Sequence, residues 1–126
     1  MKRKIYTTNE EFYEQNNALQ AGLPFAEDLS VLSEPLVIGA HTIPNRLACQ
    51  AMEGCDGTAT GEPAELTMRR YSRFARGGAG LLWFEATAVL PEGRANPRQL
   101  YIHDGNLDAF KSAVETIKEE AIKANV

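Results

Sequence analysis

Hydrophobic and polar positions divide the chain into a polar beginning and a longer region where strand-like and helix-like segments alternate. Residues 9–19 follow a cap-capable threonine, Thr8, and carry acids in the first turn, so they predict a short peripheral helix. Residues 26–35 predict an irregular connector. The apolar runs 36–38 and 41–43 flank Gly39-Ala40 and predict a small hairpin.

Two strand–helix units are predicted after the hairpin. Residues 46–52 are too continuously apolar for a strand with one wet face, and they predict a parallel strand covered on both sides. A helix is expected from about Pro63 to the Gly77-Gly78 stop, followed by a strand at 80–85 and a last helix from Asn106. The apolar stripes of the two helices are Ala64, Met68, Tyr71 and Ala75, and Leu107, Phe110, Val114, Ile117 and Ala121.

This order predicts an α/β fold with a parallel sheet and right-handed crossovers. Two such units cannot close a barrel of eight strands, which typically needs about 250 residues. The 126-residue chain is therefore expected to be incomplete as an isolated fold. Residues 1–35 are interpreted as an N-terminal extension, and residues 36–126 as the N-terminal part of a barrel domain.

Composition excludes several classes of protein. The hydrophobic share of 44% argues against disorder. A formal net charge of -4 argues against nucleic-acid binding, which needs clustered positive charge. No apolar run approaches the roughly 18 residues of a membrane span, and no apolar segment follows the basic start, so a cytoplasmic location is expected. In that compartment Cys49 and Cys55 are expected to be free thiols.

In such a fold, chemistry gathers in the loops that follow the strands. Here these loops are residues 53–61 and 87–105, which are long for their type and rich in glycine. The glycine-rich run 77–80 is not a phosphate-binding loop, because it closes a helix and opens a strand instead of the reverse.

Several short motifs, in this order and spacing, resemble the Old Yellow Enzyme family of NADH:flavin oxidoreductases. Each motif is weak alone, but the ordered set from about Leu36 to Asn125 is specific. The motifs are Ile43-Pro44-Asn45-Arg46-Leu47-Ala48 with Ala51-Met52, Tyr71 with Gly77-Gly78-Ala79-Gly80-Leu81-Leu82, Glu85-Ala86-Thr87-Ala88-Val89, Pro91-Glu92-Gly93-Arg94, and Arg98-Gln99-Leu100.

The resemblance implies an FMN-binding (β/α)8 TIM barrel that takes hydride from NADH or NADPH and reduces activated alkenes or related small acceptors. The hairpin would then cover the bottom of the barrel. By the same resemblance, Ala51, Met52 and Glu53 lie where the flavin ring is contacted, and Ala86 is the small residue that lets the ring approach. Gln99 would pair with the pyrimidine edge, since an amide supplies both a donor and an acceptor. No residue is assigned a catalytic role or a metal.

Two questions stay open at this point. Glu53 departs from the family pattern: its carboxylate either lies near the flavin and lowers its potential, or points away and caps the turn from Gly54 to Gly57. The second question concerns the whole chain, which by itself is expected to be inactive. Its open sheet edges also fit a non-catalytic module that self-associates as a homo-oligomer or completes a separate chain.

Overall fold

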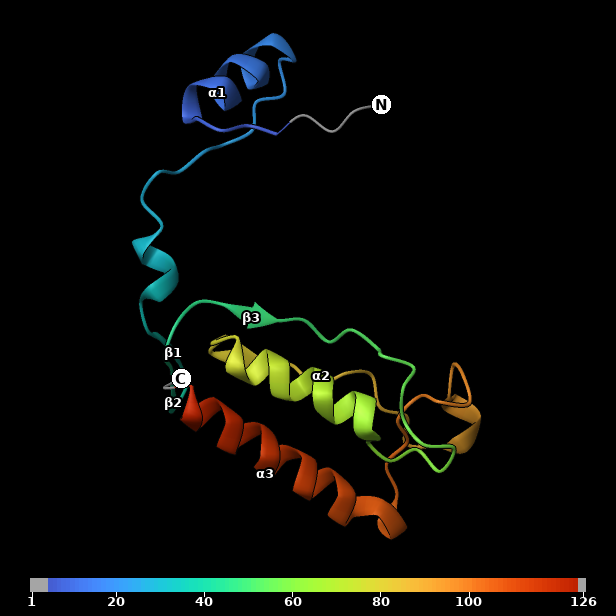
Figure 1. The fold of residues 1–126 in the computed structure, drawn as a ribbon. Helices are drawn as coiled ribbons and strands as arrows, with labels where there is room; N and C mark the ends of the chain where they lie inside the picture. The colour runs from blue at the N-terminus through green and yellow to red at the C-terminus, as the bar shows by residue number, and fades with distance from the viewer. Residues whose placement is uncertain (1–4, 125–126) are drawn as a thin grey trace.

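The fold is described from a computed structural model that covers residues 5–124 (Figure 1). Helices α2 (Glu65–Arg76) and α3 (Leu107–Lys123) lie side by side, and the short strands β3 (Ala48–Cys49) and β4 (Leu81–Leu82) lie along the other side of α2. The expected α/β class is confirmed. Residues 5–124 form no closed barrel.

The predicted hairpin is present. Strands β1 (Leu36–Ile38) and β2 (His41–Ile43) pair antiparallel with Leu36 opposite Ile43. Gly39 lies in the turn with a φ of 58°, a left-handed conformation that glycine adopts without a steric penalty.

Strands β3 and β4 pair in parallel, as predicted, with α2 as the crossover between them. Backbone bonds from Leu81 N to Leu47 O at 3.3 Å and from Trp83 N to Cys49 O at 3.1 Å continue the pairing at its edges. Both strands are shorter than the expected 46–52 and 80–85. A residue counts as part of a strand only where it pairs with a neighbouring strand. Within residues 5–124, β3 and β4 each have one neighbour, so only the residues that pair with it are strand.

The prediction that both faces of this strand pair are covered is wrong for the described chain. Only the face toward α2 is packed, and Trp83 on the opposite face is 66% exposed. That open face carries a hollow of about 360 Å³, lined by Ala48, Cys49, Gln50, Ala51, Leu81 and Trp83.

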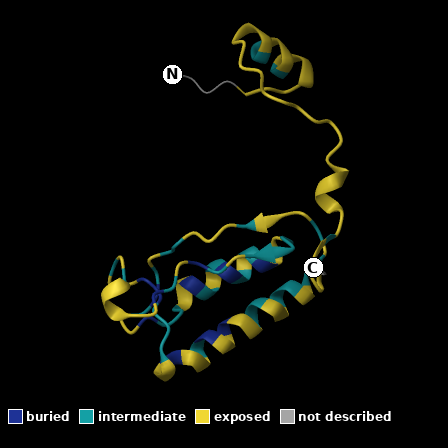
Figure 2. Ribbon diagram, turned by 180° about the vertical axis from the view of Figure 1, so that it is seen from behind, coloured by how far each residue is buried: buried dark blue, intermediate teal, exposed yellow. Residues whose placement is uncertain are grey.

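The core lies between the two long helices and the loops at one end of the molecule, where Figure 2 shows the buried segments. Tyr71 of α2 is 2% exposed and stacks on Phe84 with ring centroids 4.5 Å apart. Phe84 in turn contacts Phe110 of α3 edge-on. Leu100, from the loop after β4, is completely buried.

The two predicted helix stripes are only partly correct. Tyr71, Ala75 and Phe110 are buried, but Leu107 and Val114 remain 38% and 44% exposed. They lie on a flank of α3 that borders a solvent-open hollow of about 340 Å³. Thr67, which the stripe did not include, is fully buried because its hydroxyl donates to Asp56 Oδ1 at 2.7 Å.

The N-terminal segment lies apart from this core (Figure 1). Helix α1 (Asn9–Ala18) begins as predicted, with the Thr8 hydroxyl accepting from Glu11 N at 3.3 Å. Phe12 and Phe25 pack with ring centroids 5.1 Å apart and close a small aromatic cluster. The 3-10 helix η1 (Ser30–Ser33) leads from this segment to the hairpin. No helix of residues 5–124 is long and apolar enough to cross a bilayer.

Candidate functional site

The parallel register of β3 and β4 brings the segments that follow both strands to one edge. Cys49 pairs with Leu82, so both strands run in the same direction and the segments that follow them leave the pair on the same side. A hydrogen bond of 2.8 Å from Gly54 N to Glu85 Oε2 joins the two segments directly. Residues 51–54 and 85–87 therefore form a single rim, called the strand-end rim below.

Three of the predicted site residues present open surface at or beside this rim. Ala51 and Ala86 are exposed, and Met52 is 70% exposed. Two small residues and one flexible thioether leave room for a flat ligand to approach the backbone. Ala51 also lines the hollow on the open face of the strand pair.

Gln99 reaches the rim from the loop after β4, but it is 6% exposed. Its amide Nε2 donates to Ala86 O at 3.3 Å, and its Oε1 accepts from Ala95 N at 2.5 Å. A glutamine amide has two N–H donors and two acceptor lone pairs, so each end has one position that residues 5–124 leave unused. The side chain is thus fixed beside Ala86 with part of its hydrogen-bonding capacity left.

Glu53 turns away from the open surface of the rim. Its Oε1 accepts from the Cys55 thiol at 3.2 Å and from the Asn96 amide. These bonds are made to two side chains and not to the backbone of the turn from Gly54 to Gly57, so both interpretations of Glu53 stay predictions. The bond from Cys55 to Glu53, together with burial and the Glu53 charge, raises the pKa of the Cys55 thiol. A raised thiol pKa means little thiolate at neutral pH, so Cys55 is not an activated nucleophile.

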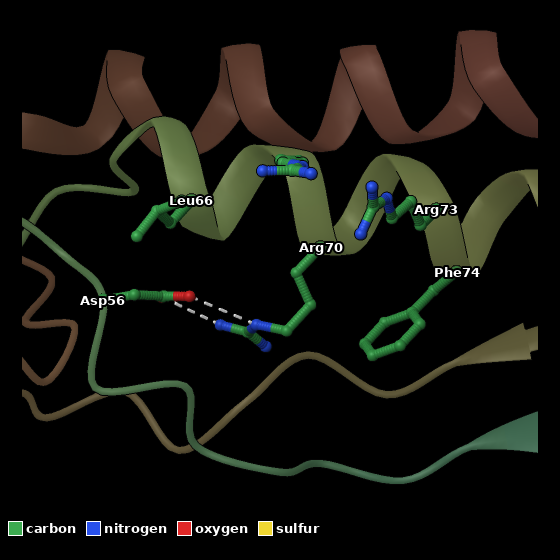
Figure 3. A pocket seen from close by; sticks show the side chains of 6 residues that line it. Asp56, Leu66, Arg70, Arg73 and Phe74 are labelled. Carbon is green, nitrogen blue, oxygen red and sulfur yellow. Dashed lines mark hydrogen bonds and ion pairs between the residues drawn. The ribbon is translucent and has the colours of Figure 1, made fainter.

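An ionic cluster lies directly behind the rim. The Arg70 guanidinium, from α2, contacts Glu85 Oε1 at 2.6 Å and Asp56 Oδ1 at 2.9 Å. The Glu85 side chain is 1% exposed. Figure 3 shows Arg70 extending from the helix toward Asp56 across a hollow of about 460 Å³. That hollow is larger than the one on the strand face, but its lining comes from α2 and Asp56 and does not include Gln99.

The cluster sets the protonation of its members. Burial alone raises the pKa of Asp56, but hydrogen bonds from Arg70 and Thr67, with the Arg70 charge, hold it below its usual range. Burial likewise lowers the pKa of Arg70. The hydrogen bonds to Asp56 and Glu85 and their negative charges have the larger effect, so the Arg70 pKa is raised. Asp56 and Arg70 are therefore ionised at neutral pH.

Arg94 fixes the loop that carries Gln99. Its guanidinium donates to the backbone oxygens of Gln99 at 3.1 Å and Ala59 at 2.9 Å, and also to those of Thr58 and Pro97. The loop after β4 is thereby tied to the loop after β3. Arg94 therefore has a structural role, with backbone carbonyl groups as its partners.

Sequence reasoning did not single out Arg70 or Asp56. One available signal was Glu85, a carboxylate at the end of an apolar strand, because a buried charge requires a cation or several donors. The pattern could not say which arginine would supply it. Within residues 5–124 no group of three His, Cys, Asp or Glu side chains could hold a metal ion.

Comparison with known proteins decides the family. The profile of the NADH:flavin oxidoreductase / NADH oxidase family matches residues 31–126. The chain belongs to this family. The resemblance read from the sequence motifs is thereby confirmed.

Relatives within the NADH:flavin oxidoreductase family include an NADPH dehydrogenase of Bacillus cytotoxicus, 32% identical over 75% of this chain and 28% of the relative. Another is an NADPH dehydrogenase of a Geobacillus species, 32% identical over 77% of this chain and 29% of the relative. A solved Old Yellow Enzyme homologue from Zymomonas mobilis is 27% identical, with a TM-score of 0.62 over 71% of this chain and 25% of its own. The chain thus spans less than a third of these relatives.

Proposed function

We propose that this chain contributes the first part of an FMN site in an NAD(P)H-dependent flavin oxidoreductase. The observation that carries the proposal is the strand-end rim, where Ala86 follows one strand, Ala51 and Met52 follow its parallel neighbour, and a hydrogen bond joins the two segments. Membership of the NADH:flavin oxidoreductase family supports the choice of a flavin as the ligand.

The residues at the rim fit one flank of an isoalloxazine ring. Ala51 and Ala86 leave space for close approach, Met52 offers a polarizable contact to an aromatic ring, and Gln99 retains one donor and one acceptor position. When bound, FMN would supply hydride transfer from NADH or NADPH to a small acceptor such as an activated alkene. The part of these residues is to hold and orient the ring.

The same residues offer little to the FMN phosphate. Arg94, in the same loop as Gln99, has its donors engaged by backbone carbonyls. We therefore expect residues 1–126 alone to bind flavin through the ring only, weakly, and with little preference for FMN over riboflavin.

A titration of the isotope-labelled chain with riboflavin and with FMN, followed by amide chemical shifts, tests this proposal. Shifts should move at Met52, Ala86 and Gln99 with both ligands, at affinities weaker than micromolar. A substitution A86L should abolish these shifts by filling the approach, whereas A18L on the exposed face of α1 should not. Absence of rim shifts would overturn the proposed site, and submicromolar FMN binding would show that the phosphate is held by this chain.

A second candidate function is favoured by the open strand face. Trp83 is 66% exposed there, beside a hollow of about 360 Å³, and such a face can bind another chain. On this candidate the chain is a non-catalytic module that self-associates. Size-exclusion chromatography with light scattering separates the two: a colourless oligomer dissociated by W83S supports the assembly module, and a monomer that binds flavin at the rim supports the enzyme.

A further inference from the structure

The backbone of residues 52–54, where the loop after β3 begins, is hydrogen-bonded by the side chains of Arg70 and Glu85. Arg70 Nη1 donates to Met52 O at 3.4 Å, while Glu85 Oε2 accepts from Gly54 N at 2.8 Å. These two bonds fix the peptide groups on either side of Glu53. They therefore determine the direction in which residues 52 and 53 leave the strand.

The two holding groups are themselves paired. Arg70 Nη2 lies 2.6 Å from Glu85 Oε1, so both carboxylate oxygens of Glu85 have a partner. Asp56 fixes the guanidinium from the other side, with its Oδ2 accepting from Arg70 Nε at 3.3 Å. A carboxylate with 1% exposed side-chain area depends on such partners, because an unpaired buried charge is strongly destabilising.

Gly54 completes the arrangement. A Cβ at this position would lie 1.9 Å from Arg70 Nη2 and 2.5 Å from Arg70 Cζ. The guanidinium can therefore reach both Glu85 and Met52 only because residue 54 has no side chain.

We propose that Arg70 and Glu85 are positioning residues that hold the backbone of residues 52–54 in the orientation required at the flavin site. The flavin part of this proposal rests on the proposed function above. The neighbouring arginines Arg69 and Arg73 are exposed and form no ion pair within residues 5–124, so the role is specific to position 70 on α2.

The test measures amide hydrogen exchange residue by residue in the 126-residue chain. In R70M the Gly54 amide should exchange at least about tenfold faster, since the carboxylate that accepts it loses its partner, while central α3 amides keep their wild-type rates. R73M is the matched control on the same helix and should change neither. Equal acceleration at Gly54 and throughout α3 would reduce Arg70 to a general stabilising role and overturn the proposal.

Two further variants keep the test decisive if R70M does not fold. G54A retains every charge but displaces the guanidinium, and should accelerate exchange of the residue-54 amide, which donates to Glu85, by a similar factor. R70K should restore the global stability lost in R70M but not the protection of Gly54, because an ammonium cannot bridge Glu85, Asp56 and a carbonyl together. Wild-type exchange at the loop amides in both variants would refute the positioning role.

A riboflavin titration of the same variants separates this proposal from the proposed function. If the wild-type rim shows no flavin shifts while Gly54 exchange still depends on Arg70, the flavin site is wrong and the positioning of the loop stands. If flavin shifts at Met52 persist unchanged in folded R70M or G54A, the positioning role fails and the flavin site stands.

Discussion

Replacing Tyr71 with phenylalanine tests how the end of β4 is attached to α2. The Tyr71 hydroxyl accepts from Glu85 N at 2.7 Å, and both residues are buried, at 2% and 4% exposure. Phenylalanine keeps the ring stacked on Phe84 but removes the acceptor, so the Glu85 N–H is left buried without a partner. Such a loss costs about 1–3 kcal/mol.

We therefore expect Y71F to lower the free energy of unfolding by about 1–2 kcal/mol, as measured by urea denaturation followed by far-UV circular dichroism. The Glu85 amide should also lose its protection from hydrogen exchange. Y13F is the matched control, because Tyr13 is 40% exposed and lies in the separate aromatic cluster, and it should change stability by less than about 0.5 kcal/mol. A Y71F chain as stable as the wild type, with Glu85 still protected, would refute the reasoning.

Other parts of the structure give two more predictions. Asp56 has a folded-state pKa below its unfolded value of about 3.9, so the stability it contributes is complete above that value and is lost as pH falls through the folded pKa. D56N should accordingly be less stable at neutral pH and lose less on acidification, and parallel pH profiles of the two chains in urea denaturation would contradict this. At Gly61 the φ is 90° and a Cβ would lie 2.7 Å from Tyr101 O, so G61A should lower the unfolding free energy by about 1–3 kcal/mol. G93A, with nothing within 4 Å of the added Cβ, should be nearly neutral in the same assay, and equal losses in both variants would refute the steric argument.

Local patterns predicted the helices well and the strands poorly, for a physical reason. The start of α1 follows from Thr8 and the end of α2 from Gly77, because caps and stops act within one turn of the chain. Strand length depends on how many neighbours a segment pairs with, which is not a local property. The apolar run of residues 46–52 predicted a strand covered on both sides. In the structure only Ala48 and Cys49 of this run pair with β4.

The candidate site also has a part that local sequence patterns predict and a part that they do not. The position of Ala86 and Met52 at adjacent strand ends follows from parallel pairing and was predictable. The contact of Arg70 with Glu85 was not, because it depends on the rotation of α2 about its axis and on the path of a loop. The burial of Gln99 was also missed, since a polar residue in a polar loop gives no sign of the two hydrogen bonds that take it inside.

The groups that hold the strand-end rim act mainly on backbone atoms. Gly54 is held through its N–H, Met52 through its carbonyl and Ala86 through its carbonyl. Any residue supplies a carbonyl oxygen, so the bonds at positions 52 and 86 do not depend on which side chains stand there, whereas position 54 requires glycine. This explains how the chain can carry Glu53 where the family pattern has another residue, with its carboxylate satisfied by Cys55 and Asn96. The side chains that would face a flavin at the proposed site are then free to differ while the backbone that presents them keeps its path.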